Sequence, residues 1–104
     1  MSPALAYPHI EKVDAAPARL QRIPRVRVAQ IAMDYIAYGW SADEMCRQHS
    51  YLTLAEVHAA LGYYFDHQQE IDDEIRAEVR EDEALAKAAQ HSPFFLRLRA
   101  KGLL

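Results

Sequence analysis

Residues 41–61 read SADEMCRQHSYLTLAEVHAAL and hold two helix-start signals a short distance apart. In the first, the Ser41 hydroxyl is placed to accept a hydrogen bond from the amide of Glu44, whose carboxylate reaches back to the amide of residue 41. Thr53 and Glu56 repeat the same arrangement. Two capping boxes this close together predict two helices, residues 41–49 and residues 53 onward, joined by a tight turn.

A further helix is predicted upstream, over residues 28–38, because apolar residues recur there at helical spacing and Gly39 follows as a stop signal. Three helices in this order, the last two joined by a short turn, are typical of a helix-turn-helix unit. Four prolines exclude a long helix from residues 1–27. A short β ribbon is expected there instead, within about residues 9–28, pairing residues 9–13 with residues 25–28.

Downstream of Thr53 the apolar positions continue at helical spacing to Ile75, and no proline occurs before Pro93. This pattern predicts one long third helix whose second half projects from the domain. The expected fold is therefore mainly α: a helix-turn-helix-like three-helix core with a short N-terminal β ribbon, a long projecting third helix and a C-terminal tail. We expect residues 1–75 to form the helix-turn-helix-like domain and residues 76–104 to form a helical extension and partner-binding tail.

Length, cysteine content and charge restrict the class of protein. With 104 residues, the chain has the size of one domain. The single cysteine, Cys46, excludes an intramolecular disulfide, and no apolar run approaches the ~20 residues needed to span a membrane, so a cytoplasmic protein is expected. The net charge of −3 is unevenly distributed: residues 1–39 carry +2, residues 40–92 carry −8 and residues 93–104 carry +3. Such asymmetry indicates charged partners.

The basic N-terminal region supplies candidate DNA contacts. Arg22, Arg25 and Arg27 are candidates for binding phosphates. In a DNA-binding helix-turn-helix protein the start of the third helix enters the major groove, where Thr53 and His58 would be exposed. The alternative is structural, because Thr53 belongs to a capping box and arginines beside prolines also suit a soluble edge ribbon.

The histidines and the cysteine show no arrangement typical of a metal or catalytic site. His58 and His67 would lie on opposing faces of one helix, too far apart for one ion. Cys46 falls on the core side of its helix, where a free cysteine behaves as a small hydrophobe. We therefore expect no metal, no cofactor and no enzymatic activity.

The last residues form a tail that is rich in apolar and basic side chains, unlike the polar termini of most small domains. The predicted partner-binding residues comprise apolar anchors and two arginines suited to carboxylates: Phe94, Phe95, Leu96, Arg97, Arg99 and Leu103. The alternative is a last short helix that folds back on the chain's own core.

From about residue 7 to residue 75 the chain resembles the family known as domain of unknown function 433. The strongest similarity lies in GWSADEM at residues 39–45, LTLAEVHAALGYYFDH at residues 52–67 and EID at residues 70–72. The RVRV of residues 25–28 also looks like the family's Arg-Ile-x-Val. Here, however, Ile23 and Pro24 replace the usual Gly-Thr, and the glycine pair that normally lies upstream is absent.

Several members of this family look like antitoxins of VapBC-type modules, so the resemblance implies a homodimer and a PIN-like ribonuclease toxin as partner. In such toxins a carboxylate cluster holds Mg²⁺, and Arg97 or Arg99 of the tail would occupy that cluster as a bidentate guanidinium. The leading hypothesis is an antitoxin-like protein that inhibits such a toxin through its C-terminal helix and tail and autoregulates its operon by binding operator DNA. The alternatives are a helix-turn-helix transcriptional regulator without a toxin partner and a homo-oligomeric structural domain.

Overall fold

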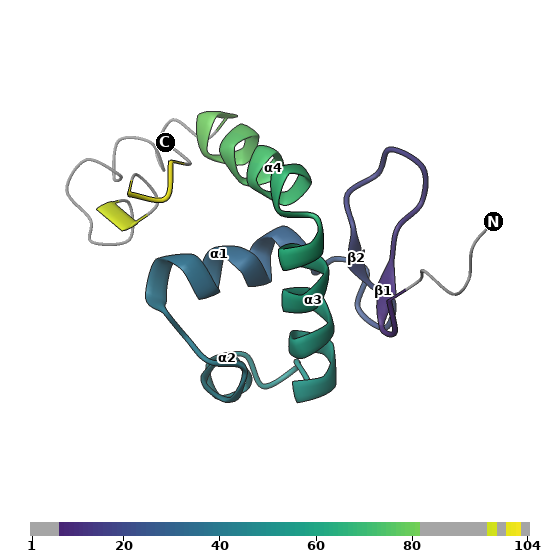
Figure 1. The fold of residues 1–104 in the computed structure, drawn as a ribbon. Coiled ribbons are helices and arrows are strands. Elements are labelled where there is room, and N and C mark those ends of the chain that lie inside the picture. Colours follow the sequence, from purple (N-terminus) through teal and green to yellow (C-terminus); the bar gives the residue numbers. More distant parts are fainter. Residues whose placement is uncertain (1–6, 82–95, 98–99, 103–104) are drawn as a thin grey trace.

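The computed structural model describes residues 7–81, 96–97 and 100–102 (Figure 1). A two-stranded sheet precedes four helices in the order β1 (Ile10–Glu11), β2 (Arg19–Leu20), α1 (Val28–Tyr38), α2 (Ala42–Gln48), α3 (Leu54–Asp66) and α4 (Gln68–Glu81). In Figure 1, α3 stands roughly upright, with α2 at its foot, α1 beside it and α4 across the top. The expected mainly α fold with a short N-terminal ribbon is confirmed.

The helix ends predicted from the capping signals are confirmed. The Ser41 hydroxyl accepts a hydrogen bond from the amide of Glu44 at 3.1 Å, but the predicted capping box is only half formed, because the Glu44 carboxylate accepts from Arg47 and Gln48 instead of the Ser41 amide. Thr53 forms the complete capping box with Glu56. Gly39 ends α1 in the left-handed conformation, at φ 67°, and its amide donates to the Tyr35 carbonyl. Glycine adopts this backbone conformation without a steric penalty, which explains the stop at this position.

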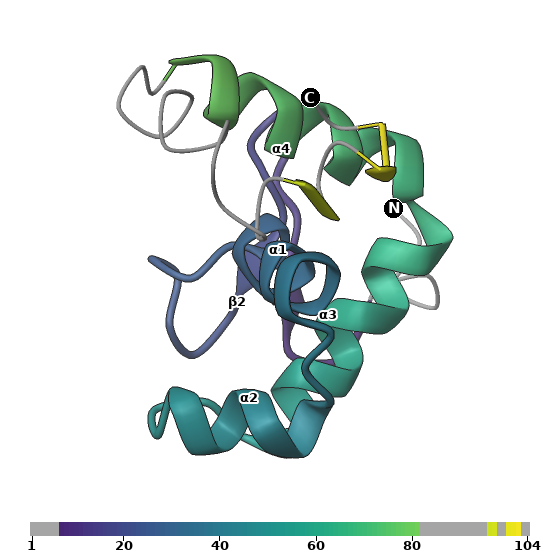
Figure 2. The same cartoon turned by 90° about the vertical axis from the view of Figure 1, so that its left-hand side faces the viewer.

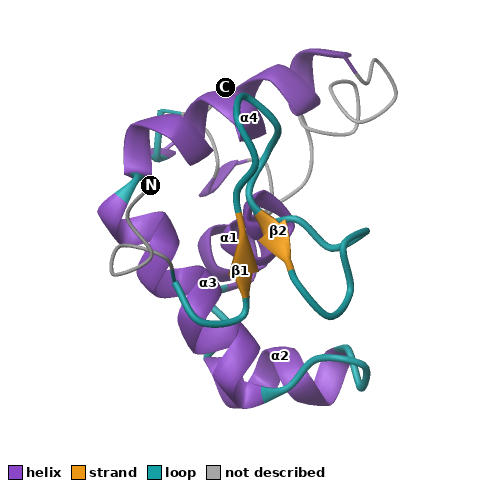
Figure 3. Ribbon diagram, turned by 90° about the vertical axis from the view of Figure 1, so that its right-hand side faces the viewer, coloured by secondary structure: helices purple, strands orange, loops and turns teal. Residues whose placement is uncertain are grey.

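The predicted pairing of the ribbon is wrong in its second strand. β1 pairs antiparallel with β2, placing Ile10 opposite Leu20, whereas residues 25–28 contribute only an isolated bridge between Arg27 and Arg19 (Figure 3). The expected strand cannot extend because Val28 already begins α1. Residues 21–26 instead form a turn, closed by a hydrogen bond from the Leu20 amide to the Val26 carbonyl.

The predicted long projecting third helix is also wrong, because it is divided at His67. There the backbone leaves the helical region, at φ −129° and ψ 44°, and the His67 ring stacks on that of Tyr63 with centroids 4.1 Å apart. α4 then turns back and lies over α1 (Figures 1 and 2). The domain boundary expected after residue 75 falls inside α4, which continues to Glu81.

The burial of an apolar stripe explains this turn. Ile71, Ile75 and Val79 are four residues apart along an otherwise charged helix, and all three are buried in the core. A projecting helix would leave them in water, whereas burial stabilises each by ~1.5–3 kcal/mol. Two hydrogen bonds fix the turn: Tyr63 donates to Glu70 at 3.0 Å and Tyr64 to Asp72 at 2.8 Å.

No helix in the described part of the chain is long and apolar enough to cross a membrane.

Candidate functional site

The first predicted site residue, Arg22, is bound within the domain. Its guanidinium forms a two-pronged pair with Glu56, with Nε at 2.9 Å from Oε2 and Nη2 at 2.7 Å from Oε1. Nη2 also donates to the Tyr51 carbonyl in the turn before α3. Glu56 is only 2% exposed, so Arg22 compensates a buried charge and holds the loop of residues 21–26 against the start of α3.

Thr53 belongs to the same network. It is the residue that caps α3, and its amide donates to Glu56 Oε1 at 3.1 Å. Hydrogen bonds from Arg22, and secondarily from Thr53, hold the pKa of Glu56 below its usual value despite burial. In this fold Thr53 therefore makes the helix-capping contacts of the structural alternative.

Of the other two candidate arginines, Arg27 is bound to a carboxylate of the domain and Arg25 is exposed. Arg27 donates to Glu78 of α4 at 2.8 Å and thereby links the start of α1 to α4. Arg25 is exposed and lies over the Tyr51 ring, 5.2 Å from its centroid. Among the described residues no carboxylate forms an ion pair with Arg25, so its charge is available to a partner.

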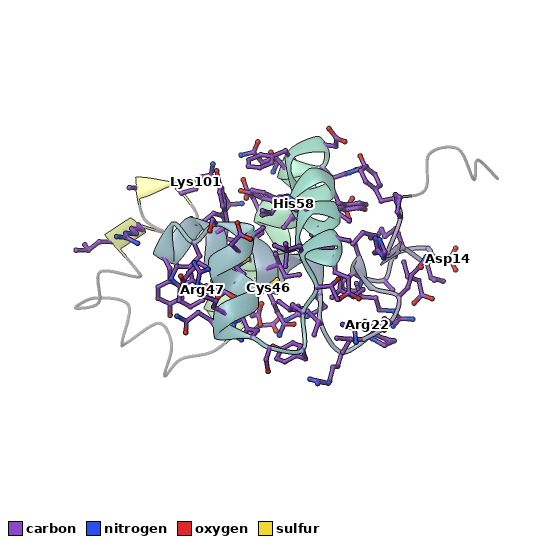
Figure 4. The ribbon with its side chains drawn as sticks, turned by 90° about the horizontal axis from the view of Figure 1, so that it is seen from below. Asp14, Arg22, Cys46, Arg47, His58 and Lys101 are labelled. Carbon is purple, nitrogen blue, oxygen red and sulfur yellow. The ribbon has the colours of Figure 1, made fainter. Side chains whose placement is uncertain are left out.

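His58 is exposed on α3 and lies apart from this arginine network. It follows Glu56 by two residues, a rotation of roughly 200° around a helix, so it points away from the side on which Arg22 binds. Figure 4 shows Arg22 beside the N-terminal region and His58 on α3, well separated from it. The five predicted DNA-binding residues thus do not form one continuous basic surface.

An unpredicted pair joins α1 to the end of α2. His49 Nε2 lies 3.0 Å from Asp34 Oδ2, at the edge of a cavity of about 300 Å³ that Met33, Tyr51 and Leu52 also line. Burial raises the pKa of Asp34, and the hydrogen bond with His49 partly opposes this shift. Nothing in the sequence indicated the pair, since the two residues lie 15 positions apart on different elements.

The predicted partner-binding residues are only partly described. Phe94, Phe95, Arg99 and Leu103 lie outside the described residues. Leu96 is 56% exposed. Arg97 Nη1 donates to the Ala37 carbonyl at 2.6 Å, which satisfies one of the carbonyls that the end of α1 leaves without a helical partner.

A second hydrogen bond holds this part of the chain against the domain. Arg76 Nη2 of α4 donates to the Gly102 carbonyl at 2.9 Å. Of the described tail residues, Arg97 therefore contacts α1 and Gly102 contacts α4; the views in Figures 1 and 2 show the described pieces of the tail near these helices. These two contacts agree with the alternative expectation that the tail folds back on its own domain.

Around these contacts the tail forms an open pocket with the end of α1. The pocket has a volume of about 500 Å³ and is lined by Tyr35, Ile36 and Gly39 of α1 and by Arg97, Ala100 and Lys101 of the tail. An aromatic ring and an aliphatic side chain thus face two cations. This combination suits an acidic ligand with an apolar part. Lys101 and Tyr35 were not predicted as site residues.

Metal-binding and nucleophilic groups are not assembled in the described part of the chain. No group of three or more His, Cys, Asp or Glu side chains there could hold a metal ion. Burial raises the pKa of the Cys46 thiol, which favours the unreactive protonated form.

Comparison with known proteins adds one finding. Residues 22–64 match the model of the family described as "Protein of unknown function (DUF433)". No curated protein and no solved structure matches the chain. The matched segment extends from Arg22 through α1 and α2 to the buried Tyr64 of α3, and so covers most of the helix-turn-helix-like unit. Through residues 22–64, the chain is similar to the DUF433 family.

Proposed function

We propose that the chain is a non-enzymatic, cytoplasmic, antitoxin-like protein that binds and inhibits a PIN-like ribonuclease toxin through its C-terminal segment. The observation that supports this proposal most directly is the tail pocket, which Arg97 and Lys101 line together with Tyr35. Leu96, the residue before Arg97, is exposed. The identity of the partner rests on the resemblance to VapB-like members of the family.

The chemistry of the tail fits a site built from carboxylates. A guanidinium offers parallel donors to a carboxylate and keeps its charge at any physiological pH. Placed among the carboxylates of a nuclease active site, Arg97 or Arg99 would occupy the position that Mg²⁺ needs. Binding requires Arg97 to exchange its hydrogen bond to the Ala37 carbonyl for charge-assisted bonds to the partner, which are stronger.

The test is inhibition of the nuclease encoded by the adjacent open reading frame. RNA cleavage is measured while the purified chain is titrated against the nuclease, with the wild type, Arg97→Ala/Arg99→Ala and the control Arg80→Ala, which removes an exposed cation from α4. We expect the double variant to lose inhibition and the control to retain it. Full inhibition by the double variant would refute this role of the tail arginines.

A DNA-binding regulator is the second candidate, and one observation favours it. Arg25 holds an exposed guanidinium beside the turn of the helix-turn-helix unit and forms no ion pair with the described residues. If the chain binds operator DNA, Arg25→Ala should weaken binding of the promoter fragment and lower the slope of log affinity against log salt by about 1. An unchanged slope would exclude Arg25 as a phosphate contact.

A further inference from the structure

A row of three glutamates runs along α4 beside its buried apolar stripe. Glu70, Glu74 and Glu78 follow one another at steps of four residues, so their side chains are neighbours on one face of the helix. All three residues are partly buried. Like charges at this spacing destabilise a helix, so the row needs cations or protons to offset the repulsion.

The two ends of the row have cationic partners, whereas the middle has none. Lys12 Nζ of the N-terminal hairpin lies 3.7 Å from Glu70 Oε2, and Arg27 donates to Glu78 Oε1 at 2.8 Å. No basic side chain in the described part of the chain forms an ion pair with Glu74. Glu74 is therefore the carboxylate whose charge is compensated least.

Two carboxylate oxygens of the row are buried and have no hydrogen-bond partner among the described residues. They are Oε1 of Glu74 and Oε2 of Glu78, and both glutamates line a pocket of about 350 Å³ together with Pro17 and Arg27. A buried acceptor without a donor is unfavourable, and more so when it is ionised. A proton bound to Glu74 would turn this carboxylate into a hydrogen-bond donor and would remove its repulsion of both neighbours.

The groups around Glu74 favour this proton on balance. The titratable and charged groups that face it are Glu70, Glu78 and Glu81 of α4, Lys12 of the hairpin, Arg27 before α1 and Tyr63 of α3. Burial raises the pKa of Glu74 most strongly, and the carboxylates of Glu70 and Glu78 raise it further. Lys12 and Arg27 act in the opposite direction, but each is already paired with another carboxylate. The Tyr63 hydroxyl donates to Glu70.

We infer that Glu74 is a proton-sensitive residue that sets how firmly α4 packs on α1 and the hairpin: binding of a proton strengthens this packing and its loss weakens it. A carboxyl group whose pKa is raised by folding destabilises the folded chain above that pKa, and the effect disappears as the pH falls toward the ordinary value of 4.5. Glu56 has the opposite dependence, because its pKa is lowered. The inference does not depend on the tail or on the identity of any toxin.

The direct test is a pH titration of the full chain followed by carbon-13 NMR of the glutamate carboxyl groups. The Glu74 signal is identified by its absence from the spectrum of Glu74→Gln. We expect this signal to titrate with a midpoint above 4.5. A midpoint at or below 4.5 would overturn the proposal.

Thermal melts of two variants separate a proton-linked role from a structural one. Glutamine resembles the protonated form of Glu74, because it is neutral and carries a donor. Glu74→Gln should therefore melt roughly 2–8 °C above the wild type at pH 7, since two like-charge pairs are removed, and the difference should shrink as the pH falls toward 4.5. The control Glu81→Gln removes an exposed negative charge from the end of the same helix, and its difference from the wild type should not depend on pH. A difference for Glu74→Gln that stays constant over this range would overturn the proposal, as would a variant that melts at or below the wild type at pH 7.

Hydrogen exchange between pH 5 and pH 7 shows where the effect lies. Protection factors, which correct for the intrinsic dependence of exchange on pH, should rise at the lower pH more in α4 than in α2. This difference between the two helices should be absent from Glu74→Gln. An equal change in both helices of the wild type would place the effect outside α4 and would contradict the inference.

Discussion

Substitution of Ile75 by alanine should lower the free energy of unfolding strongly, although Ile75 lies in a helix with mostly charged residues. Ile75 is fully buried, with 0% exposure, between Ile71 and Val79 of α4. The substitution removes three carbon atoms, or ~2.4 kcal/mol of transfer free energy at ~0.8 kcal/mol each. The cavity adds a further term, so the expected loss in the free energy of unfolding is about 3 kcal/mol.

This substitution distinguishes a packed α4 from a projecting one, because on a projecting helix it would not reduce the free energy of unfolding. On an exposed helix, isoleucine to alanine is neutral or slightly stabilising, since alanine has the higher helix propensity. Urea denaturation followed by circular dichroism measures the change, and a loss of ~3 kcal/mol lowers the melting temperature by roughly 10–20 °C in a domain of this size. Arg80→Ala, on the exposed face of the same helix, serves as the control. A loss below ~1 kcal/mol for Ile75→Ala would refute the packing of α4 on the core.

Three further predictions follow from the contacts of the arginines. Arg22→Ala should lower the melting temperature more than Arg25→Ala in thermal melts, because only Arg22 compensates the buried Glu56; equal effects would contradict this assignment. The pKa of Glu56 is lowered from 4.5, chiefly by Arg22, so its contribution to stability is present above that pH and is lost as the pH falls. The stability of Arg22→Ala, measured by urea denaturation between pH 3 and pH 7, should therefore depend less on pH than that of the wild type, and an unchanged profile would refute the pairing. Arg76→Ala removes the hydrogen bond to the tail and should increase affinity for the nuclease roughly two- to tenfold by calorimetry, while weaker binding would show that the contact assists capture.

The local signals in the sequence were sufficient to place the helices of the core. The hydroxyl cap at Ser41, the capping box at Thr53 and the left-handed stop at Gly39 act through hydrogen bonds between residues three or four positions apart, so the local sequence contains every participant. The spacing of apolar residues located the buried face of α3 in part: Val57 and Tyr64 are buried, whereas Leu54 at the same spacing is 45% exposed.

The division of the long helix was not predictable from the same signals. Neither proline nor glycine marks the break at His67, and the apolar spacing continues through it to Ile75. The turn depends on contacts that form only in the folded chain, namely the stacking of His67 on Tyr63 and the burial of the α4 stripe against α1.

The ion pairs of the candidate site were likewise not predictable from local sequence patterns. Arg22 and Glu56 are 34 residues apart, and Arg27 and Glu78 are 51 apart, so no local pattern shows that these arginines already have partners. The sequence identified the arginines as a basic cluster, whereas the fold distributes them among separate carboxylates and leaves Arg25 as the member without an ion pair among the described residues.

The central proposal is that the C-terminal segment captures a nuclease. The most direct measurement is calorimetric titration of the product of the adjacent open reading frame with the full chain and with a chain that lacks residues 93–104. Helicity by circular dichroism provides the control, because the described core ends before the deleted segment. The proposal predicts that the full chain binds and that the shortened chain stays folded but does not bind; equal binding by both chains would contradict it.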